Sequence, residues 1–335
     1  MKAWRIENDD GIDALNLTDV DIGDPGYGEV KFRVLSSSIN RRDFNTVLAP
    51  SARNTPLPRI PNSDAAGEVI SVGDGVTEFK PGDRVASCFF KRWEGGRMRG
   101  PIMASALGGA EEGMLSEEAI LPQTALVSLP DHLTWDEAGT LTCAGVTAWN
   151  ALVEQGGLTA GDTVVVMGTG GVSIFALQFA KMMGARVIVT SKSDAKLERV
   201  RDLGADETIN YVDTPDWDQA VMELTDGRGA DHVVEVGGAG TLQKSIAATG
   251  FAGHIGMIGV LTQGEVNPYP LLGKSIRLTG IYVGNREMFR NMNAAIAANE
   301  MRPVVDASYD FGDARSAYNA MGEDGHFGKL VIRVS

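Results

Sequence analysis

The stretch Val164-Val-Val-Met-Gly-Thr-Gly-Gly-Val-Ser173 joins a short apolar run to an amphipathic segment through three glycines. An apolar run bounded by glycine is typical of a buried strand, and residues 172–183 have the apolar spacing of a helix. Gly168 allows a tight turn, and Gly170 lets the backbone approach a pyrophosphate. The following helix start, with Gly171 and Val172, supplies unpaired N–H donors and a positive dipole end. The stretch therefore predicts a dinucleotide-binding turn.

The surroundings of this turn make the prediction specific. Ser173 stands where the dinucleotide fingerprint has a third Gly or Ala, and a glycine turn alone is a weak signal. Here, however, apolar runs alternate with amphipathic segments. We expect strands at 164–167, 186–190, 207–211, 232–236, 254–259 and 277–283, and helices at 172–183, 194–203, 216–225 and 241–248. Apolar strands alternating with helices indicate an α/β fold with a doubly wound parallel sheet covered on both faces.

The rest of the chain has a different pattern of polar and apolar residues. Residues 29–35 alternate polar and apolar, and residues 67–87 read as strand, turn and strand. Short strands separated by glycine favour an antiparallel, barrel-like domain. Residues 135–155 have helical spacing, and the chain ends in one or two helices and a strand at 329–334. We expect a first domain at 1–125, a nucleotide-binding domain at 126–284, and a return to the first domain at 285–335.

Composition narrows the class of protein. The chain has 335 residues with 30 Lys and Arg against 44 Asp and Glu, a net charge of −14. This charge argues against nucleic acid or an anionic membrane as the main partner, and a small-molecule substrate is expected instead. We find no apolar run of membrane-spanning length and no apolar signal core near the N-terminus. Only two cysteines, Cys88 and Cys143, suit a reducing cytoplasm.

The end of the second strand of the parallel sheet selects the cofactor. An NAD site there normally places an Asp or Glu on the ribose hydroxyls. This chain instead has Ser191 and Lys192, with Lys196 following, and no acid before Asp194. Hydroxyl and ammonium groups suit a 2′-phosphate, which favours NADP(H). The same residues also suit a solvated helix start capped by Ser193 or Asp194.

Several motifs in order along the chain resemble one enzyme family. These are Ser37–Asp43, Pro61–Val85, Thr142–Trp149, Leu203–Asp206 with Ile209–Tyr211, and His326–Val331. The segment 61–85 is similar to the quinone oxidoreductase signature of the medium-chain dehydrogenases/reductases, within the alcohol dehydrogenase superfamily. The resemblance implies a GroES-like β-barrel catalytic domain built from both chain ends and a Rossmann domain between them. The segment 91–99 matches no motif of that family.

The resemblance also implies which residues contact the cofactor. Asn40 and Thr147 would lie beside the nicotinamide and its ribose, and Tyr211 near the adenosine ribose or phosphate. The nicotinamide would be flanked, and the site closed, by Gly259, Val260, Val283, Asn285, Gly328 and Lys329. Structural alternatives exist: Asn40 as a turn residue, Tyr211 as a core aromatic and Lys329 as a solvated charge.

Zinc-dependent members of the superfamily need three protein ligands for the catalytic ion. At the corresponding places this chain has Ser-Ser-Ile-Asn40, then Asn62-Ser63-Asp64, and only Cys143 as a ligand type. Cys88 stands alone where a structural zinc lobe needs four cysteines. We therefore expect no zinc in this protein, and we interpret Cys143 as a small buried residue.

The sequence identifies no clear proton donor. Asp43 and Asp64 are weak candidates for a proton relay, and pairing with Arg41, Arg42 or Arg59 is the more common fate of such a charge. Hydride transfer to a quinone or polarised alkene can take its proton from solvent while the protein orients the reactants.

Three functions fit these features. The first is a zinc-independent, NADPH-dependent oxidoreductase that transfers hydride to a quinone, an enone or an activated carbonyl. The second is an NADP-linked alcohol or aldehyde dehydrogenase without metal, and the third is a non-catalytic nucleotide-binding redox sensor. We also expect a homodimer paired through the strand at 277–283, because an uncovered sheet edge invites pairing.

Overall fold

The computed structural model describes residues 1–323 and 325–334 and divides into two compact units. The first unit is Met1–Val146 with Gly284–Ser335, and the second is Thr147–Val283. We expected the nucleotide-binding part to begin at residue 126. Residues 126–146 instead stay with the first unit, because β7 (Leu126–Ser128) pairs with β5 (Arg84–Ser87) and α3 (Trp135–Ala138) contacts β3.

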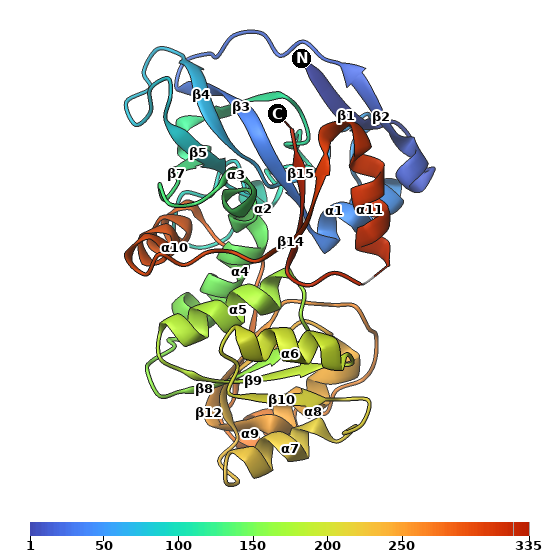
Figure 1. Cartoon of the computed structure of the whole chain (residues 1–335), viewed down its shortest axis with the longest axis vertical. Helices are drawn as coiled ribbons and strands as arrows, with labels where there is room; N and C mark the ends of the chain where they lie inside the picture. Colours follow the sequence, from blue (N-terminus) through green and yellow to red (C-terminus); the bar gives the residue numbers. More distant parts are fainter. Residues whose placement is uncertain (324, 335) are drawn as a thin grey trace. The chain divides into compact units, whose positions relative to one another are not determined.

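The second unit, green to orange in Figure 1, is built on a six-stranded parallel sheet. The order of its strands is β10-β9-β8-β11-β12-β13. This is the strand order of a doubly wound dinucleotide-binding fold, with the order reversing between β8 and β11. The strands are β8 (Thr163–Met167), β9 (Arg186–Ser191), β10 (Glu207–Asn210), β11 (Ala230–Glu235), β12 (Thr249–Met257) and β13 (Arg277–Gly280). The helices are α5 (Gly171–Met182), α6 (Asp194–Asp202), α7 (Trp217–Leu224), α8 (Ala239–Ala248) and α9 (Tyr269–Gly273).

The burial of β8 explains why its sequence is continuously apolar. All five of its residues are buried, so helices cover both faces of the sheet. On one face, Val165 joins a cluster with residues of α7 and α8. Apart from the ends, the expected strands and helices of this unit are present. The last strand ends at Gly280 rather than Val283, and Val283 has a φ of +54°, outside the extended conformation of a strand.

The first unit contains a seven-stranded sheet in the order β14-β15-β3-β4-β5-β7, with β6 also paired to β3. Its central strand is β3 (Glu29–Ile39), and the others are β4 (Ala66–Val72), β5, β6 (Glu118–Pro122), β7, β14 (Val305–Asp310) and β15 (Lys329–Arg333). A separate two-stranded sheet joins β1 (Lys2–Ile6) to β2 (Leu15–Asp19). Figure 1 shows the first strand, β1, and the last strand, β15, in this unit. The expected antiparallel pairing is confirmed along β3, β4 and β5.

Helices of the first unit are α1 (Arg41–Leu48), α2 (Gly100–Met103), α3, α10 (Arg286–Ala298) and α11 (Ala314–Gly322). The helical stretch expected at 135–155 is not continuous. After α3, two wide π-helical turns at Leu141–Gly145 and Asn150–Gln155 flank α4 (Val146–Trp149), which spans the boundary between the units. Short 3₁₀ turns occur at Gly11–Ala14, Ser51–Arg53, Gln123–Ala125 and Phe311–Asp313. Within the described part of the chain, no helix has both the length and the apolar character to cross a bilayer.

Candidate cofactor and active site

The glycine turn after β8 has the geometry that a phosphate group needs. Gly168 has a φ of +69°, which a residue with a side chain adopts only at a cost. Gly170 is the N-cap of α5, and a Cβ atom built on it would meet no other atom within 4 Å. Open space therefore adjoins the N-terminus of a twelve-residue helix, next to Gly171 and Val172. A pyrophosphate fits this donor set of backbone N–H groups and a helix dipole.

Ser173, the departure from the fingerprint, has a structural role. Its buried hydroxyl donates a hydrogen bond to the carbonyl of Met167 at the end of β8, at 2.6 Å. The side chain thus ties α5 to the strand before it, at the position where the fingerprint uses a small residue for close packing.

The predicted phosphate-selecting residues follow β9. Ser191 is buried, its hydroxyl accepts from the backbone N–H of Ser193 at 3.3 Å, and its carbonyl accepts from the N–H of Tyr211. Lys192 is exposed, and Lys196 lies half-buried in the first turn of α6. The Ser193 hydroxyl caps α6, so the helix-cap interpretation holds for that residue.

Tyr211 directly follows β10, with 39% of its surface exposed. This exposure rules out the alternative of a core aromatic residue.

The predicted nicotinamide-side residues of this unit follow the last two strands. Gly259 packs so tightly that a Cβ atom would lie 1.6 Å from the carbonyl oxygen of Val236. Val260 is 78% exposed, and Val283 is buried three residues after β13 ends. Thr147 is buried in α4 at the start of the unit. Because the strands are parallel, the residues after β8, β9, β10, β12 and β13 all lie at the carboxyl edge of one sheet, where ligands of such sheets bind.

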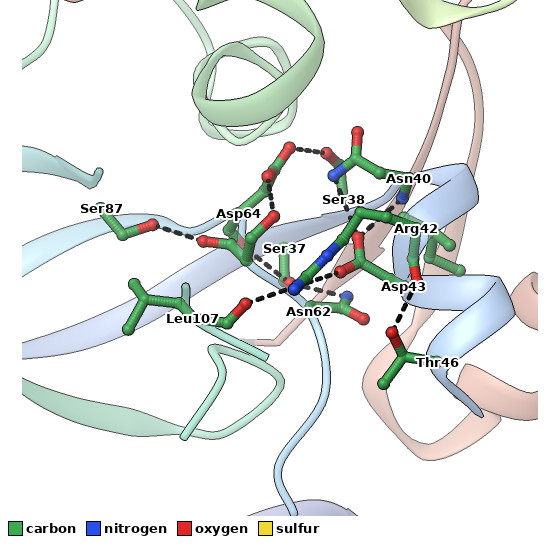
Figure 2. A network of polar contacts seen from close by, with 12 residues as sticks. Ser37, Ser38, Asn40, Arg42, Asp43, Thr46, Asn62, Asp64, Ser87 and Leu107 are labelled. Atoms are coloured by element: carbon green, nitrogen blue, oxygen red, sulfur yellow. Dashed lines mark hydrogen bonds and ion pairs between the residues drawn. The ribbon is translucent and has the colours of Figure 1, made fainter. Parts of the chain in front are cut away.

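In the first unit, a buried polar network surrounds the junction of β3 and α1 (Figure 2). Asn40 is the N-cap of α1, and its backbone N–H and Nδ2 both donate to Oδ2 of Asp43, at 2.9 and 3.0 Å. Arg42 binds the other oxygen of Asp43 at 3.1 Å and the carbonyl of Leu107. Burial raises the pKa of Asp43, and the charge of Arg42 opposes that rise. Asn40 therefore caps the start of α1. Asp43 forms an ion pair with Arg42, which is the alternative to a role in proton transfer that the sequence analysis left open.

Asp64 belongs to the same network and has a different partner from those expected. Its carboxylate accepts hydrogen bonds from Ser38 at 2.8 Å and Ser63 at 2.7 Å. The Nζ of Lys329 lies 3.7 Å from Oδ2 of Asp64, so Asp64 forms an ion pair with a lysine from β15.

Lys329 is only 3% exposed, which rules out a solvated charge. Its ammonium also donates to the carbonyl of Ile39 and to Oδ1 of Asn40. The network therefore combines two acids, Asp43 and Asp64, with two cations, Arg42 and Lys329.

The donor set here does not fit a catalytic zinc ion. Ser63 donates its hydroxyl to Asp64, and an ammonium already faces the oxygens of Asp64 and Asn40. Cys143 is half-buried, rather than buried as we expected. Desolvation raises the pKa of its thiol, with Asp64 adding to the rise, so a thiolate ligand is disfavoured. Among the described residues, no group of three or more His, Cys, Asp and Glu side chains is arranged to hold a metal ion.

The remaining predicted site residues have structural partners. Asn285 caps α10 by accepting from the N–H of Met288 at 2.9 Å. The first two N–H groups of that helix, of Arg286 and Glu287, donate to the backbone carbonyls of Trp93 and Glu94. The segment 91–99, which matched no motif, thus anchors the start of α10. Gly328 has a φ of +78°, and a Cβ atom there would lie 2.7 Å from the Val304 carbonyl.

Sequence reasoning missed part of this network. The buried Tyr318 hydroxyl donates to Oδ1 of Asn62, whose Nδ2 donates to Ser37 at 3.0 Å. Tyr318 lies 256 positions from Asn62, and no local pattern signals such a pair. The chain order of known motifs placed Asn62 near the site without indicating its partner.

Two family models match the chain: the alcohol dehydrogenase GroES-like domain over residues 26–131, and the zinc-binding dehydrogenase domain over residues 171–298. The zinc-type alcohol dehydrogenase-like protein of Schizosaccharomyces pombe is 41% identical over 315 residues, 92% of this chain and 91% of that one. The quinone oxidoreductase of Rattus norvegicus is 27% identical over 99% of this chain and 97% of its own length.

A crystal structure of an NAD-dependent alcohol dehydrogenase matches with a TM-score of 0.91, at 31% identity and 100% coverage of both chains. The sheet order, the glycine turn and these similarities define an NAD(P)H-dependent oxidoreductase with a GroES-like and a Rossmann-like part. The chain belongs to the medium-chain dehydrogenase/reductase superfamily.

Proposed function

We propose that this oxidoreductase works without zinc and transfers a hydride from NADPH to a quinone, an enone or an activated carbonyl compound. The observation that carries the proposal is the buried ammonium of Lys329, which faces Asn40 and Asp64. By the resemblance described above, Asn40 and Asp64 stand at places where zinc-dependent members of the superfamily have ligands. A dication beside that ammonium would be repelled, since two positive charges at short range in a protein interior cost several kcal/mol. Without a Lewis acid, an already polarised acceptor is the suitable substrate class.

The chain's own residues would bind and orient the reactants. The N–H groups at Gly170 and Gly171 would hold the pyrophosphate, and the residues after β12 and β13 would flank the nicotinamide. Bound NADPH supplies the hydride. Asp43 and Asp64 are fully partnered by Asn40, Arg42, Ser38, Ser63 and Lys329, so solvent is the proton source in this proposal.

The residues at the end of β9 are the basis for proposing a preference for NADPH over NADH. Ser191 and the exposed Lys192 stand where an NAD-binding chain places an acid. The related crystal structure is named as an NAD-dependent enzyme, so the assay must compare both cofactors.

NADPH and NADH oxidation against a panel of quinones, enones and aldehydes tests the function. We expect turnover with quinones or enones, and faster turnover with NADPH than with NADH. Turnover restricted to aldehydes and alcohols would favour the alcohol dehydrogenase alternative, which the name of the Schizosaccharomyces pombe relative suggests. Tight binding of cofactor with no turnover on any acceptor would favour a redox sensor.

We propose that two copies pair through β13. This strand is the edge of the six-stranded sheet, and it carries partly exposed Leu278, with Tyr282 close behind it. An uncovered edge strand presents unpaired N–H and C=O groups to a second copy. Sedimentation at micromolar concentration should give a dimer, and a monomer would contradict the pairing.

We also propose a cytoplasmic location. Cys88 and Cys143 are both free, and burial raises the pKa of Cys88 to about 12. Free, unreactive thiols suit a reducing compartment. Cell fractionation with a tagged chain tests this directly.

A further inference from the structure

Val283 has an unusual backbone conformation. Its φ of +54° lies in the left-handed region, which a β-branched residue rarely adopts because its side chain collides with the backbone. Strain of this kind persists only where neighbouring groups hold it, and it gathers at ligand-binding positions.

A single side chain holds this backbone from a distance in sequence. Nδ2 of Asn150 donates a hydrogen bond to the carbonyl oxygen of Val283 at 2.7 Å, across 133 positions. Asn150 and Val283 are 5% and 6% exposed, so water competes little for this bond. Nε2 of Gln155 donates to Oδ1 of Asn150 at 3.3 Å and fixes the orientation of the amide.

The strained residue Val283 lies at a different edge of the sheet from the other non-glycine residues of this unit that have a positive φ. Three other non-glycine residues of the second unit have a positive φ: Asp226, Ala252 and Ser275. Asp226 follows the end of α7, Ala252 lies early in β12, and Ser275 precedes β13. Val283 instead follows β13, at the carboxyl edge of the sheet that also carries the glycine turn after β8.

We propose that Asn150 is a positioning residue that holds the Val283 backbone in the shape that receives the nicotinamide half of the cofactor. The identity of the ligand rests on the function proposed above. The hydrogen bond keeps a strained peptide in one conformation before the cofactor arrives, so binding does not have to order it.

The test uses Asn150→Asp, which keeps the size of the side chain and replaces the donor with an oxygen that repels the Val283 carbonyl. NADPH affinity, measured by fluorescence titration, should fall at least about tenfold, or 1.4 kcal/mol. Adding Val283→Gly should restore the affinity to within about threefold, because glycine adopts a positive φ without strain. Ser275→Gly is the matched control: it relieves the same kind of strain at the other end of the sheet and should restore nothing.

Unchanged NADPH affinity in Asn150→Asp, or no rescue by Val283→Gly, would overturn the proposal, even if the variant unfolds more easily. If Asn150→Asp does not fold, Asn150→Ala with and without Val283→Gly gives the same comparison. A wild-type protein that binds neither NADPH nor NADH would contradict the proposed function instead. Urea unfolding then tests the hydrogen bond itself: Asn150→Asp must lower the free energy of unfolding, because it replaces a buried donor to the Val283 carbonyl by an acceptor, and unchanged stability overturns the proposal.

Discussion

Lys329 and Lys192 were both predicted to contact the cofactor, yet the two units use them in opposite ways. Lys329 of the first unit is buried. Its ammonium donates hydrogen bonds to Ile39 and Asn40 and pairs with Asp64, all within the protein. Lys192 of the second unit is exposed at the end of β9, near a glycine turn that borders open space. Polar groups of the buried network hold the fold, whereas those of the sheet edge are available to a ligand.

The comparison predicts that changes in the network reduce stability and changes at the sheet edge reduce binding. The largest effect is expected for Lys329→Met. Removing the ammonium leaves the buried Asp64 without its ion-pair partner Lys329, which should lower the free energy of unfolding by about 3–5 kcal/mol. Lys192→Met, the same substitution at the exposed position, should change it by less than about 0.5 kcal/mol. Urea unfolding measures both, and equal effects would remove the distinction between the two regions.

Two buried groups, His254 in the second unit and Asp43 in the first, should respond to acid with opposite signs. Burial, with Arg277 and His232 nearby, lowers the pKa of His254 in the second unit to about 4. Between that value and 6.5 the unfolded chain binds the extra proton, so stability falls as the pH is lowered. Burial raises the pKa of Asp43 in the first unit, so its contribution to stability rises on acidification.

His254→Leu isolates the first of these effects. Stability lost by the wild type between pH 7 and pH 5 should shrink by about 2 kcal/mol in the variant, following the shift from 6.5 to about 4. Urea unfolding at both pH values measures it. A variant that loses as much stability as the wild type would show that His254 is not the group that titrates.

At the sheet edge, Gly170→Ser separates binding from stability. Serine is a favourable N-cap and adopts the observed φ of −75°, so the free energy of unfolding should hardly change. The new side chain would fill the space proposed for the pyrophosphate and weaken NADPH and NADH equally, by about tenfold or more. Gly273→Ser, at another glycine with open surroundings, is the control and should leave both affinities intact. Unaltered cofactor binding in Gly170→Ser would place the pyrophosphate elsewhere.

The smallest expected effect is on the choice between cofactors. Lys192→Ala should weaken NADPH several-fold and leave NADH nearly unchanged, because an exposed charge contributes only about 1 kcal/mol. Ser191→Asp should favour NADH by repelling the 2′-phosphate and accepting from the ribose hydroxyls. Fluorescence titrations of both cofactors measure the ratio. An equal loss for NADPH and NADH in Lys192→Ala would show that this residue does not select the phosphate.

The two units also differ in how much of their structure could be predicted from the sequence. The strands and helices of the second unit were predicted almost completely, because buried parallel strands such as Thr163–Met167 have a continuous apolar sequence. In the first unit, β14 was missed: its sequence Val-Asp-Ala-Ser-Tyr-Asp is polar, and its pairing with β15 depends on residues far along the chain. The sequence also did not predict that Lys329 is buried, because a single charged residue does not indicate which elements pack against β15. The glycine turn was found by its pattern, and the Asn150–Val283 bond, across 133 positions, was not.

We propose that the buried ammonium of Lys329 takes the place of a catalytic zinc ion in a hydride-transferring enzyme. Elemental analysis of the purified protein, combined with NADPH oxidation by a quinone or enone before and after a chelator, tests it most directly. We predict far less than one zinc per chain and the same rate after chelation. Close to one zinc per chain, with activity that disappears on its removal and returns on its addition, would contradict the account.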